Sequence, residues 1–289
     1  MIYRAKHTTM YMYSDPVSIC HSEVHLRPRE HPSQRLLEHE LVIMPEPDFL
    51  DSRGDYFGNE VACFSIHSPH ETLTITSTSV VEVEEREPPE PTLSPAWESV
   101  RDQLREGAPD ELFEAVPFTF SSPQAPLAPA YAEYARPCFP EGRPFLAAVA
   151  ELSSRICKEF EYDPRATSVT TPVEEVLKKR KGVCQDFAHL MIACLRSLGL
   201  PARYVSGYLR SGEKTVGAEA SHAWVSAHCP VFGWQDFDPT NNVRPQGQHV
   251  TLAWGREYQD VTPVKGVALG GGEQIISVSV EVVPAVVKP

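Results

Sequence analysis

The sequence predicts an α+β protein in which an N-terminal all-β, sandwich-like domain precedes a mixed core of helices and strands. Residues 1–83 contain period-two runs of β-branched and aromatic side chains between proline-rich turns, whereas helical patterns begin only after residue 90. A charged, proline-rich stretch at residues 84–91 separates the two regions and has the composition of a linker. We therefore expect two domains, residues 1–87 and 88–289, within the chain of 289 residues.

The first domain is expected to be built of strands only. Its runs of Tyr, Thr, Val and Ile are bounded by turn-forming residues, which is the pattern of short β-strands. Gly58-Asn59 has the composition of a two-residue hairpin turn. We expect strands at residues 2–12, 17–26, 36–44 and 72–83, and a hairpin over residues 55–61.

One cluster in this domain has the residue types of a metal site. His21, Glu23 and His25 share one face of a predicted strand, and Cys20 is adjacent in sequence. The cluster has neither a Cys-x-x-Cys pair nor a helical pair of histidines, the spacings that metal sites commonly use. We therefore favour a solvated strand face and expect no metal and no cofactor.

The second domain is expected to combine helices with strands. Apolar residues recur at helical spacing in two segments, and Pro172 marks the start of a short helix that ends at Lys181-Gly182. The segment 121–140, rich in Pro and Ala, is expected to be irregular, and the glycine-rich segment 266–272 is expected to be a turn. Helices are expected at residues 97–106 and 144–160, and strands at residues 200–209, 222–227, 234–238 and 275–283.

Cys184 stands where the chain turns into a helix. From Phe187 the apolar residues fall at helical spacing, and the helix is expected to stop at Gly199, since Pro201 follows closely. The backbone N–H groups and the macrodipole at a helix start favour a thiolate over a thiol. Cys184 is therefore a candidate nucleophile.

A base and an orienting carboxylate for this thiol are expected on a downstream hairpin. If its turn lies near residues 230–232, Asp238 falls opposite His222 within a few residues of register. Cys184, His222 and Asp238 then form a nucleophile, its base and the group that orients the base. Asp236 lies on the same strand face as Asp238, so the alternation of the strand leaves both carboxylates open.

The neighbouring cysteine and histidine residues are expected to have structural roles. Cys194 lies among apolar residues of the same helix, where a cysteine usually acts as a small hydrophobic side chain. His189 is about 140° round the helix from Cys184, so it does not share the face of the thiol. His228, at the turn of the hairpin, is expected to be a surface histidine.

These motifs resemble the transglutaminase-like superfamily, whose core combines a Gly-x-Cys helix start with a His-Ala-Trp strand and an Asp-Pro-Thr strand. Residues 196–203 also resemble the stretch that closes the cysteine helix. The resemblance implies a papain-like/transglutaminase core, in which a cysteine-bearing helix packs on an antiparallel sheet. It implies Cys184 as nucleophile, His222 as general base and acid, and Asp238 rather than Asp236 as orienter.

The residues beside the cysteine depart from those of the animal cross-linking enzymes. Val183 replaces a Gln and Gln185 replaces a Trp, which separates this chain from calcium-dependent cross-linking. It is most similar to the bacterial transglutaminase-like proteins with an extra N-terminal domain, at residues 26–29 and 55–59 among others. Residues 255–261 resemble a motif near the C-terminal strand of that family. Tyr162 and Tyr208 are further candidates for the cleft.

Composition narrows the class of partner. The net charge of −13, from 39 acidic and 26 basic residues, argues against nucleic acid. The sequence has no 18-residue apolar run, so no membrane span is expected, and its start lacks the apolar region of a signal peptide. Seven cysteines with scattered spacing do not resemble a disulfide framework, and we expect a cytoplasmic protein.

The sequence therefore predicts a thiol-dependent acyl-transfer enzyme that acts on peptide or carboxamide bonds of a peptide or protein substrate. We favour a peptidase or amidase. Protein-glutamine transamidation is the alternative within the same chemistry, and a non-catalytic binding module that keeps the fold is the alternative from another class.

Overall fold

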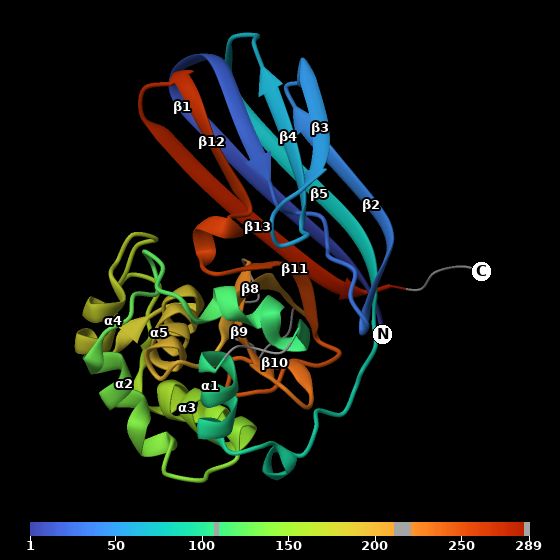
Figure 1. The fold of residues 1–289 in the computed structure, drawn as a ribbon. Coiled ribbons are helices and arrows are strands. Elements are labelled where there is room, and N and C mark those ends of the chain that lie inside the picture. The colour runs from blue at the N-terminus through green and yellow to red at the C-terminus, as the bar shows by residue number, and fades with distance from the viewer. Residues whose placement is uncertain (107–109, 211–220, 286–289) are drawn as a thin grey trace.

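The computed structural model describes residues 1–106, 110–210 and 221–285 and confirms the predicted α+β class. Figure 1 shows a β domain at the top of the view and a mixed core of helices and strands below it. The predicted boundary near residue 87 falls in the extended segment between the last N-terminal strand and the first helical turn, and it stays a prediction. None of the helices in the described ranges is long and apolar enough to cross a membrane.

The long strand β1 (Ile2–Val24) organises the β domain. Its first half pairs antiparallel with β5 (His70–Val83) on one side and β13 (Gln274–Pro284) on the other. Its second half pairs in the same way with β4 (Glu60–Ile66) and β12 (Val264–Gly270). The outer strands β2 (Gln34–Met44) and β3 (Phe49–Gly54) complete a seven-stranded sheet.

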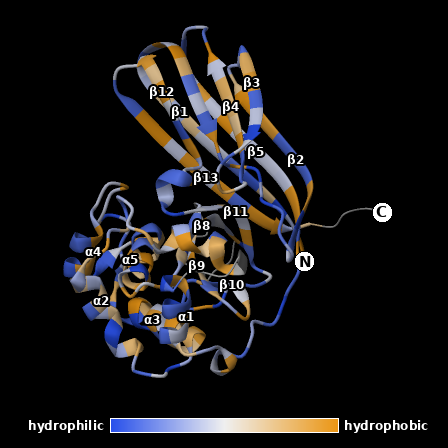
Figure 2. Cartoon of the chain, in the orientation of Figure 1, coloured by the Kyte–Doolittle hydropathy of each residue, from blue (hydrophilic) through white to orange (hydrophobic). Residues whose placement is uncertain are grey.

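The partners of β1 change where its sequence carries Ser14-Asp15-Pro16. The pairing with β5 is interrupted between Met12 and Val17, because proline has no N–H to donate to a neighbouring strand. The two strands expected at residues 2–12 and 17–26 are thus halves of one strand with different neighbours. Figure 2 shows hydrophobic and hydrophilic residues alternating along these strands, as expected when one face of a sheet is buried.

The end of the chain returns to this sheet. β12 and β13 pair with β1 although the predicted division places residues 264–284 with the core. Gly270 ends β12, Gly271 and Gly272 lie in the turn that follows, and all three have positive φ. The turn expected at residues 266–272 is therefore only partly correct, because residues 266–270 belong to β12.

The core packs helices against a four-stranded antiparallel sheet of order β10-β9-β8-β11. Helix α5 (Cys184–Ser197) is buried along nearly its whole length and packs on β8 and β9. The core strands are β8 (Ala202–Leu209), β9 (His222–Cys229), β10 (Gly233–Phe237) and β11 (His249–Gly255), and the short parallel pair is β6 (Glu161–Tyr162) with β7 (Lys181–Gly182). The other helices are α1 (Trp97–Arg105), α2 (Pro129–Ala135), α3 (Phe145–Glu159) and α4 (Val173–Lys179), with 3-10 turns η1 (Pro91–Leu93), η2 (Asp110–Thr119), η3 (Arg136–Cys138) and η4 (Tyr258–Asp260).

Three local expectations are wrong. Residues 121–140 are not irregular throughout, because α2 starts on Pro129 and buries Tyr131 and Tyr134. Helix α4 ends at Lys179 and is followed by Arg180, whose φ of 55° is left-handed, so that Lys181 and Gly182 form β7 and are not part of the helix. The turn between β3 and β4 spans residues 55–59 rather than two residues, because Asp55 accepts the N–H groups of residues 57 and 59.

Two side-chain amides of the β domain bind the backbone of the edge strand β11. Buried Gln34 donates to the carbonyl of Thr251 over 2.7 Å and accepts its N–H over 2.8 Å. Asn59 does the same with Trp254, over 2.9 and 3.0 Å. Each amide takes the place of a neighbouring strand and satisfies backbone groups of β11, so the β domain completes the edge of the core sheet.

Candidate active site

Cys184 is the first residue of α5, as the sequence predicts, and it is 8% exposed. The helix start is held by Asp186, which lies in the first turn. Its Oδ2 accepts the backbone N–H of Val183 over 2.8 Å and the hydroxyl of Thr167 over 2.6 Å. A carboxylate there satisfies a backbone donor that the helix leaves unpaired, and thus fixes the position of the thiol.

Gly182 lies directly behind this capping carboxylate. A Cβ at this position would come within 2.6 Å of Asp186 Oδ2, which is closer than a Cβ approaches other heavy atoms. Glycine therefore allows Asp186 to fold back over the chain just before the cysteine. The Gly in the Gly-x-Cys motif is explained by this contact.

His222 and Asp238 lie at one end of the β9–β10 hairpin. Phe237 pairs with Val225, which brings Asp238, just after β10, to the start of β9. His222 Nε2 bonds to Asp238 Oδ2 over 2.8 Å, and both side chains are fully buried. The hairpin thus brings the predicted base and carboxylate together.

Asp238 is held as a carboxylate by several donors. The backbone N–H groups of Thr240 and Asn241 donate to Oδ1 over 2.8 and 3.1 Å, and the side-chain amide of Asn241 donates to Oδ2 over 2.9 Å. His249 Nε2 approaches Oδ2 at 3.4 Å. Burial alone would raise the pKa of Asp238, but the bonds from His222, His249 and Asn241 hold that pKa far below its usual range.

The other nitrogen of His222, Nδ1, is buried and has no hydrogen-bond partner in the described part of the chain. Burial would lower the pKa of His222, but the negative charge of a Cys184 thiolate and the hydrogen bond to Asp238 raise that pKa to about 10, so Cys184 lies close to the ring. With Nε2 donating to Asp238, Nδ1 is the nitrogen that can accept the proton of the thiol.

Three tyrosines lie close enough to Cys184 for a charge on its thiol to affect them. Burial raises the pKa values of Tyr162, Tyr204 and Tyr258, and a charge on Cys184 raises each of them further, so their phenols stay protonated. Tyr162, one of the two predicted cleft tyrosines, is therefore near the thiol. Tyr208 is not part of this group, because its hydroxyl bonds to His7 Nδ1 of the β domain over 3.1 Å.

His189 contacts two of these tyrosines. Its ring stacks on Tyr204 with the centroids 4.9 Å apart, and Nε2 accepts the backbone N–H of Tyr258 over 3.1 Å. The structural role expected of His189 is therefore to position two tyrosines. The motif at residues 255–261 reaches the site through Tyr258.

Sequence reasoning missed Asp186, Tyr204 and His249. For Asp186 a signal exists, because an acidic residue three positions after the residue that precedes a helix is a capping pattern. Tyr204 and His249 come from separate strands of the sheet, and no local spacing connects them to Cys184.

The remaining candidate residues have other environments. Asp236 accepts the indole N–H of Trp224 over 3.0 Å. Cys194 is fully buried, which raises the pKa of its thiol and suits a structural residue. His228 is not a surface histidine as expected, since it is 5% exposed and packs edge-on against Trp234.

The cluster on β1 has partners other than a metal. His21 Nδ1 bonds to Ser65 Oγ, Glu23 accepts from Arg53 over 2.6 Å, and His25 Nδ1 bonds to the carbonyl of Thr262. Within the described ranges no three His, Cys, Asp or Glu side chains are arranged to hold a metal ion.

Comparison with known proteins agrees with this geometry. Residues 3–82 match the bacterial transglutaminase-like N-terminal region, and residues 133–239 match the transglutaminase-like superfamily. An uncharacterised protein of Mycobacterium tuberculosis is 40% identical over 98% of this chain and 92% of its own length. A protein-glutamine gamma-glutamyltransferase of Pseudomonas aeruginosa is 30% identical over 48% of this chain and 22% of its own length.

A solved structure resembles the whole chain. It is that of a proposed cysteine protease from Cytophaga hutchinsonii, which matches with a TM-score of 0.77 and 20% identity over 100% of this chain and 93% of that one. At this identity the match concerns the fold, including the placement of a β domain against the core. Together with the two matched regions, it shows that this chain belongs to the transglutaminase-like superfamily and carries the N-terminal region of its bacterial members.

Proposed function

We propose that the protein is a cysteine-dependent acyl-transfer enzyme that attacks peptide or carboxamide bonds through Cys184, His222 and Asp238. One observation carries the proposal. His222 bonds through Nε2 to the buried carboxylate of Asp238, its Nδ1 has no partner among the described residues, and Cys184, at a helix start, is close enough to raise the pKa of His222. This is the arrangement of nucleophile, base and orienter that acyl transfer requires.

In the first half of the reaction His222 Nδ1 takes the proton of Cys184, and the sulfur attacks the carbonyl carbon of the substrate. The new C–S bond places negative charge on the carbonyl oxygen, and the backbone N–H of Cys184 is a donor for it, worth about 3 kcal/mol. The imidazolium of His222 then protonates the departing amine or ammonia, the C–N bond breaks and a thioester remains. Asp238 stabilises the imidazolium throughout and stays ionised.

In the second half water replaces the amine. His222 removes a proton from the water, whose oxygen attacks the thioester carbonyl, and the C–S bond breaks to give a carboxylic acid and the free thiol. An amine in place of water would give transamidation by the same steps. We favour hydrolysis, because water is abundant and because Val183 and Gln185 stand where the cross-linking enzymes have other residues.

The proposal is tested by following three products in parallel. Ammonia release from glutamine-containing peptides reports amidase activity, new amino termini report peptidase activity, and incorporation of a labelled amine reports transamidation. The wild-type protein is expected to give one of the first two signals, and Cys184→Ala to give none. Cys194→Ala is the matched control, because it removes a thiol of the same helix that lies outside the site. Activity that survives Cys184→Ala would contradict the proposal.

We also propose that the protein works in the cytoplasm on a peptide or protein substrate and not on nucleic acid. All seven cysteines are free, which suits a reducing compartment and a reactive thiol. The net charge of −13 repels phosphates. Fractionation of cells that produce the tagged full chain tests the compartment, and recovery in a membrane or extracytoplasmic fraction would contradict it.

A further inference from the structure

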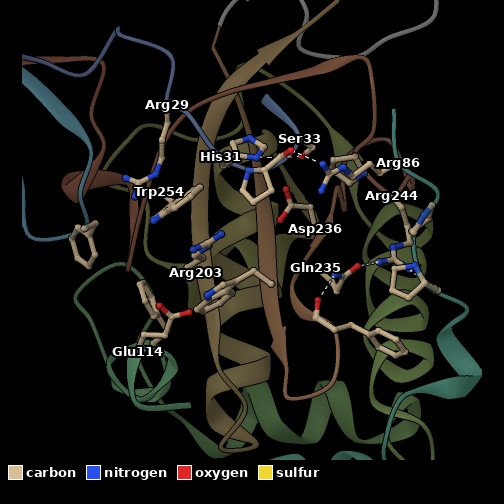
Figure 3. Close-up of a pocket in the computed structure, with 18 of the residues that line it drawn as sticks. Arg29, His31, Ser33, Arg86, Glu114, Arg203, Gln235, Asp236, Arg244 and Trp254 are labelled. Carbon is tan, nitrogen blue, oxygen red and sulfur yellow. Dashed lines mark hydrogen bonds between the residues drawn. The ribbon is translucent and has the colours of Figure 1, made fainter. Parts of the chain in front are cut away.

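A cavity of about 860 Å³ lies where the β domain, the linker and the core sheet meet, and its described walls include none of Cys184, His222 and Asp238. Figure 3 shows its charged lining. The β domain contributes Arg29 and residues 31–33 and 56–57, and the linker contributes residues 86–89. The core contributes residues of η2, β8, β10 and β11 together with Phe232, Arg244 and Pro245. The proposed acyl-transfer chemistry uses none of these residues.

Arg203, on β8, is the most unusual residue of this wall. It is 8% exposed, and its guanidinium carbon lies 4.2 Å from the ring centroid of Trp234 and 3.8 Å from that of Trp254. It donates no hydrogen bond and forms no ion pair with any residue that the structure describes, and its Nε is buried without a partner. The N–H groups of this stacked guanidinium thus have no acceptor among the described residues.

An unpaired charge in this position is costly. Burial lowers the pKa of Arg203 to about 9, and the charge of Asp236 offsets this only in part. Stacking on two indoles compensates some of the lost hydration but offers no acceptor to the N–H groups. A bound anion would supply the missing acceptors.

Two neighbouring groups also have a buried nitrogen without a partner. Arg29 stacks on Trp254 with its guanidinium carbon 3.7 Å from the ring centroid; its Nη1 donates to Asn59 Oδ1 over 2.8 Å, but its Nε is buried without a partner among the described residues. His31 Nε2 is also buried and unpartnered there. Figure 3 shows Arg29, His31 and Arg203 gathered around Trp254. With Arg244, whose Nε is likewise buried without a partner, the lining of one cavity contains four side chains with unpartnered polar nitrogens among the described residues.

The charges of the lining indicate which anion fits. Four arginines line the cavity together with three carboxylates, those of Glu87, Glu114 and Asp236, while burial lowers the pKa of His31 and keeps its imidazole neutral. The balance suits one negative charge better than the two of a phosphate. Aromatic and proline side chains form the rest of the wall and leave room for more than a small ion.

We propose that this cavity binds a carboxylate carried on an apolar or aromatic body, with Arg203 as its main partner and Arg29 and His31 beside it. A guanidinium binds a carboxylate through two parallel N–H···O bonds. The aromatic walls contact the remainder of the ligand. The proposal does not depend on the acyl-transfer function, because the two sites share no residue.

The first test uses the wild-type protein and two matched probes. 3-Phenylpropanoate and its uncharged amide are titrated while the fluorescence of the cavity tryptophans and the heat of binding are followed. The acid is expected to bind saturably, and the amide at least tenfold more weakly. Equal affinity of acid and amide, or no binding of either, would overturn the proposal. Phenyl phosphate is expected to bind more weakly than the acid, and tighter binding would overturn the carboxylate assignment.

The second test assigns the binding to Arg203. Arg203→Met is expected to reduce the affinity for 3-phenylpropanoate at least tenfold, without lowering Tm, because it removes an unpaired buried charge. Arg86→Gln is the matched control within the same cavity, since this guanidinium already bonds to Glu84 and to the carbonyl of Pro32, and it is expected to change the affinity less than threefold. Unchanged affinity in Arg203→Met would overturn the assignment.

A third variant separates the two sites. Cys184→Ala, which abolishes the proposed chemistry, is expected to bind the probe as the wild-type protein does. Loss of binding in this variant, with its Tm unchanged, would contradict the independence of the cavity. Failure of the acyl-transfer assays with intact probe binding would leave the cavity proposal standing.

Discussion

His222 donates from Nε2 to Asp238 Oδ2 over 2.8 Å, and neither side chain is exposed to solvent. The carboxylate thereby selects the tautomer that presents Nδ1 to Cys184. Asp238→Asn is expected to lower kcat by about three to four orders of magnitude, because an amide can donate to the ring and favour the wrong tautomer. Asp236→Asn makes the same change two residues away and is expected to alter kcat only a few-fold. Similar losses in both variants would contradict the role of Asp238.

Gly182→Ala is expected to destabilise the protein. The new Cβ would lie 2.6 Å from Asp186 Oδ2, so the capping carboxylate must move away from the start of α5. We expect a loss of about 1–3 kcal/mol in the free energy of unfolding, measured with urea, together with lower activity. Gly54→Ala is the control, because a Cβ there would contact nothing within 4 Å. An equal effect of the two substitutions would argue against the contact.

Buried histidines predict a loss of stability in acid. Burial lowers the pKa of His189 to about 3 and that of His7 to about 4, whereas a histidine in the unfolded chain titrates near ~6.5. As the pH falls, the unfolded state therefore binds protons before the folded state does. The contribution of these histidines to the free energy of unfolding is present above pH ~6.5 and is lost as the pH falls toward their pKa values in the folded protein. Tm is expected to fall between pH 6.5 and 4.

His189→Gln tests this assignment, since glutamine can accept the N–H of Tyr258 without titrating. The variant is expected to have a lower Tm at neutral pH but a flatter dependence of Tm on pH. His67→Gln, which removes an exposed imidazole, is the control and should follow the wild-type profile. An unchanged slope in His189→Gln would show that His189 does not carry the acid sensitivity.

Asn59→Ala is expected to weaken the attachment of the β domain to the core. It leaves the N–H and the carbonyl of Trp254 without their partner, at a cost of about 2 kcal/mol or more in the free energy of unfolding. Gln103→Ala removes an exposed amide of α1 and is expected to be nearly neutral. Stability equal to the wild type in Asn59→Ala would contradict the proposed role of this amide in joining the domains.

Local patterns in the sequence were sufficient for the elements that carry the triad. The apolar spacing after Cys184 and the turn at residues 230–232 correctly predict α5 and the β9–β10 hairpin. The return of β12 and β13 to β1 could not be predicted, because pairing between the two ends of a chain leaves no local signal. Helix α2 was missed because its proline and alanine content suggested an irregular segment.

In the site, too, local sequence patterns predict some of the residues and not others. Cys184, His222 and Asp238 lie in short motifs, whereas Tyr204, His249 and Tyr258 reach the site only through the packing of β8, β11 and η4. The sequence does not indicate a binding role for Arg203. An arginine inside an apolar strand becomes unusual only when the structure shows that its Nε has no partner among the described residues.

The reactivity of Cys184 tests the central claim most directly. The rate of iodoacetamide alkylation of the folded protein is measured against pH, with Cys184→Ala and His222→Ala alongside. We expect one thiol that reacts faster than a free cysteine, that is absent in Cys184→Ala and slowed in His222→Ala. A thiol that reacts only as a free cysteine does, with its rate rising near pH ~8.5 and unchanged in His222→Ala, would contradict the account.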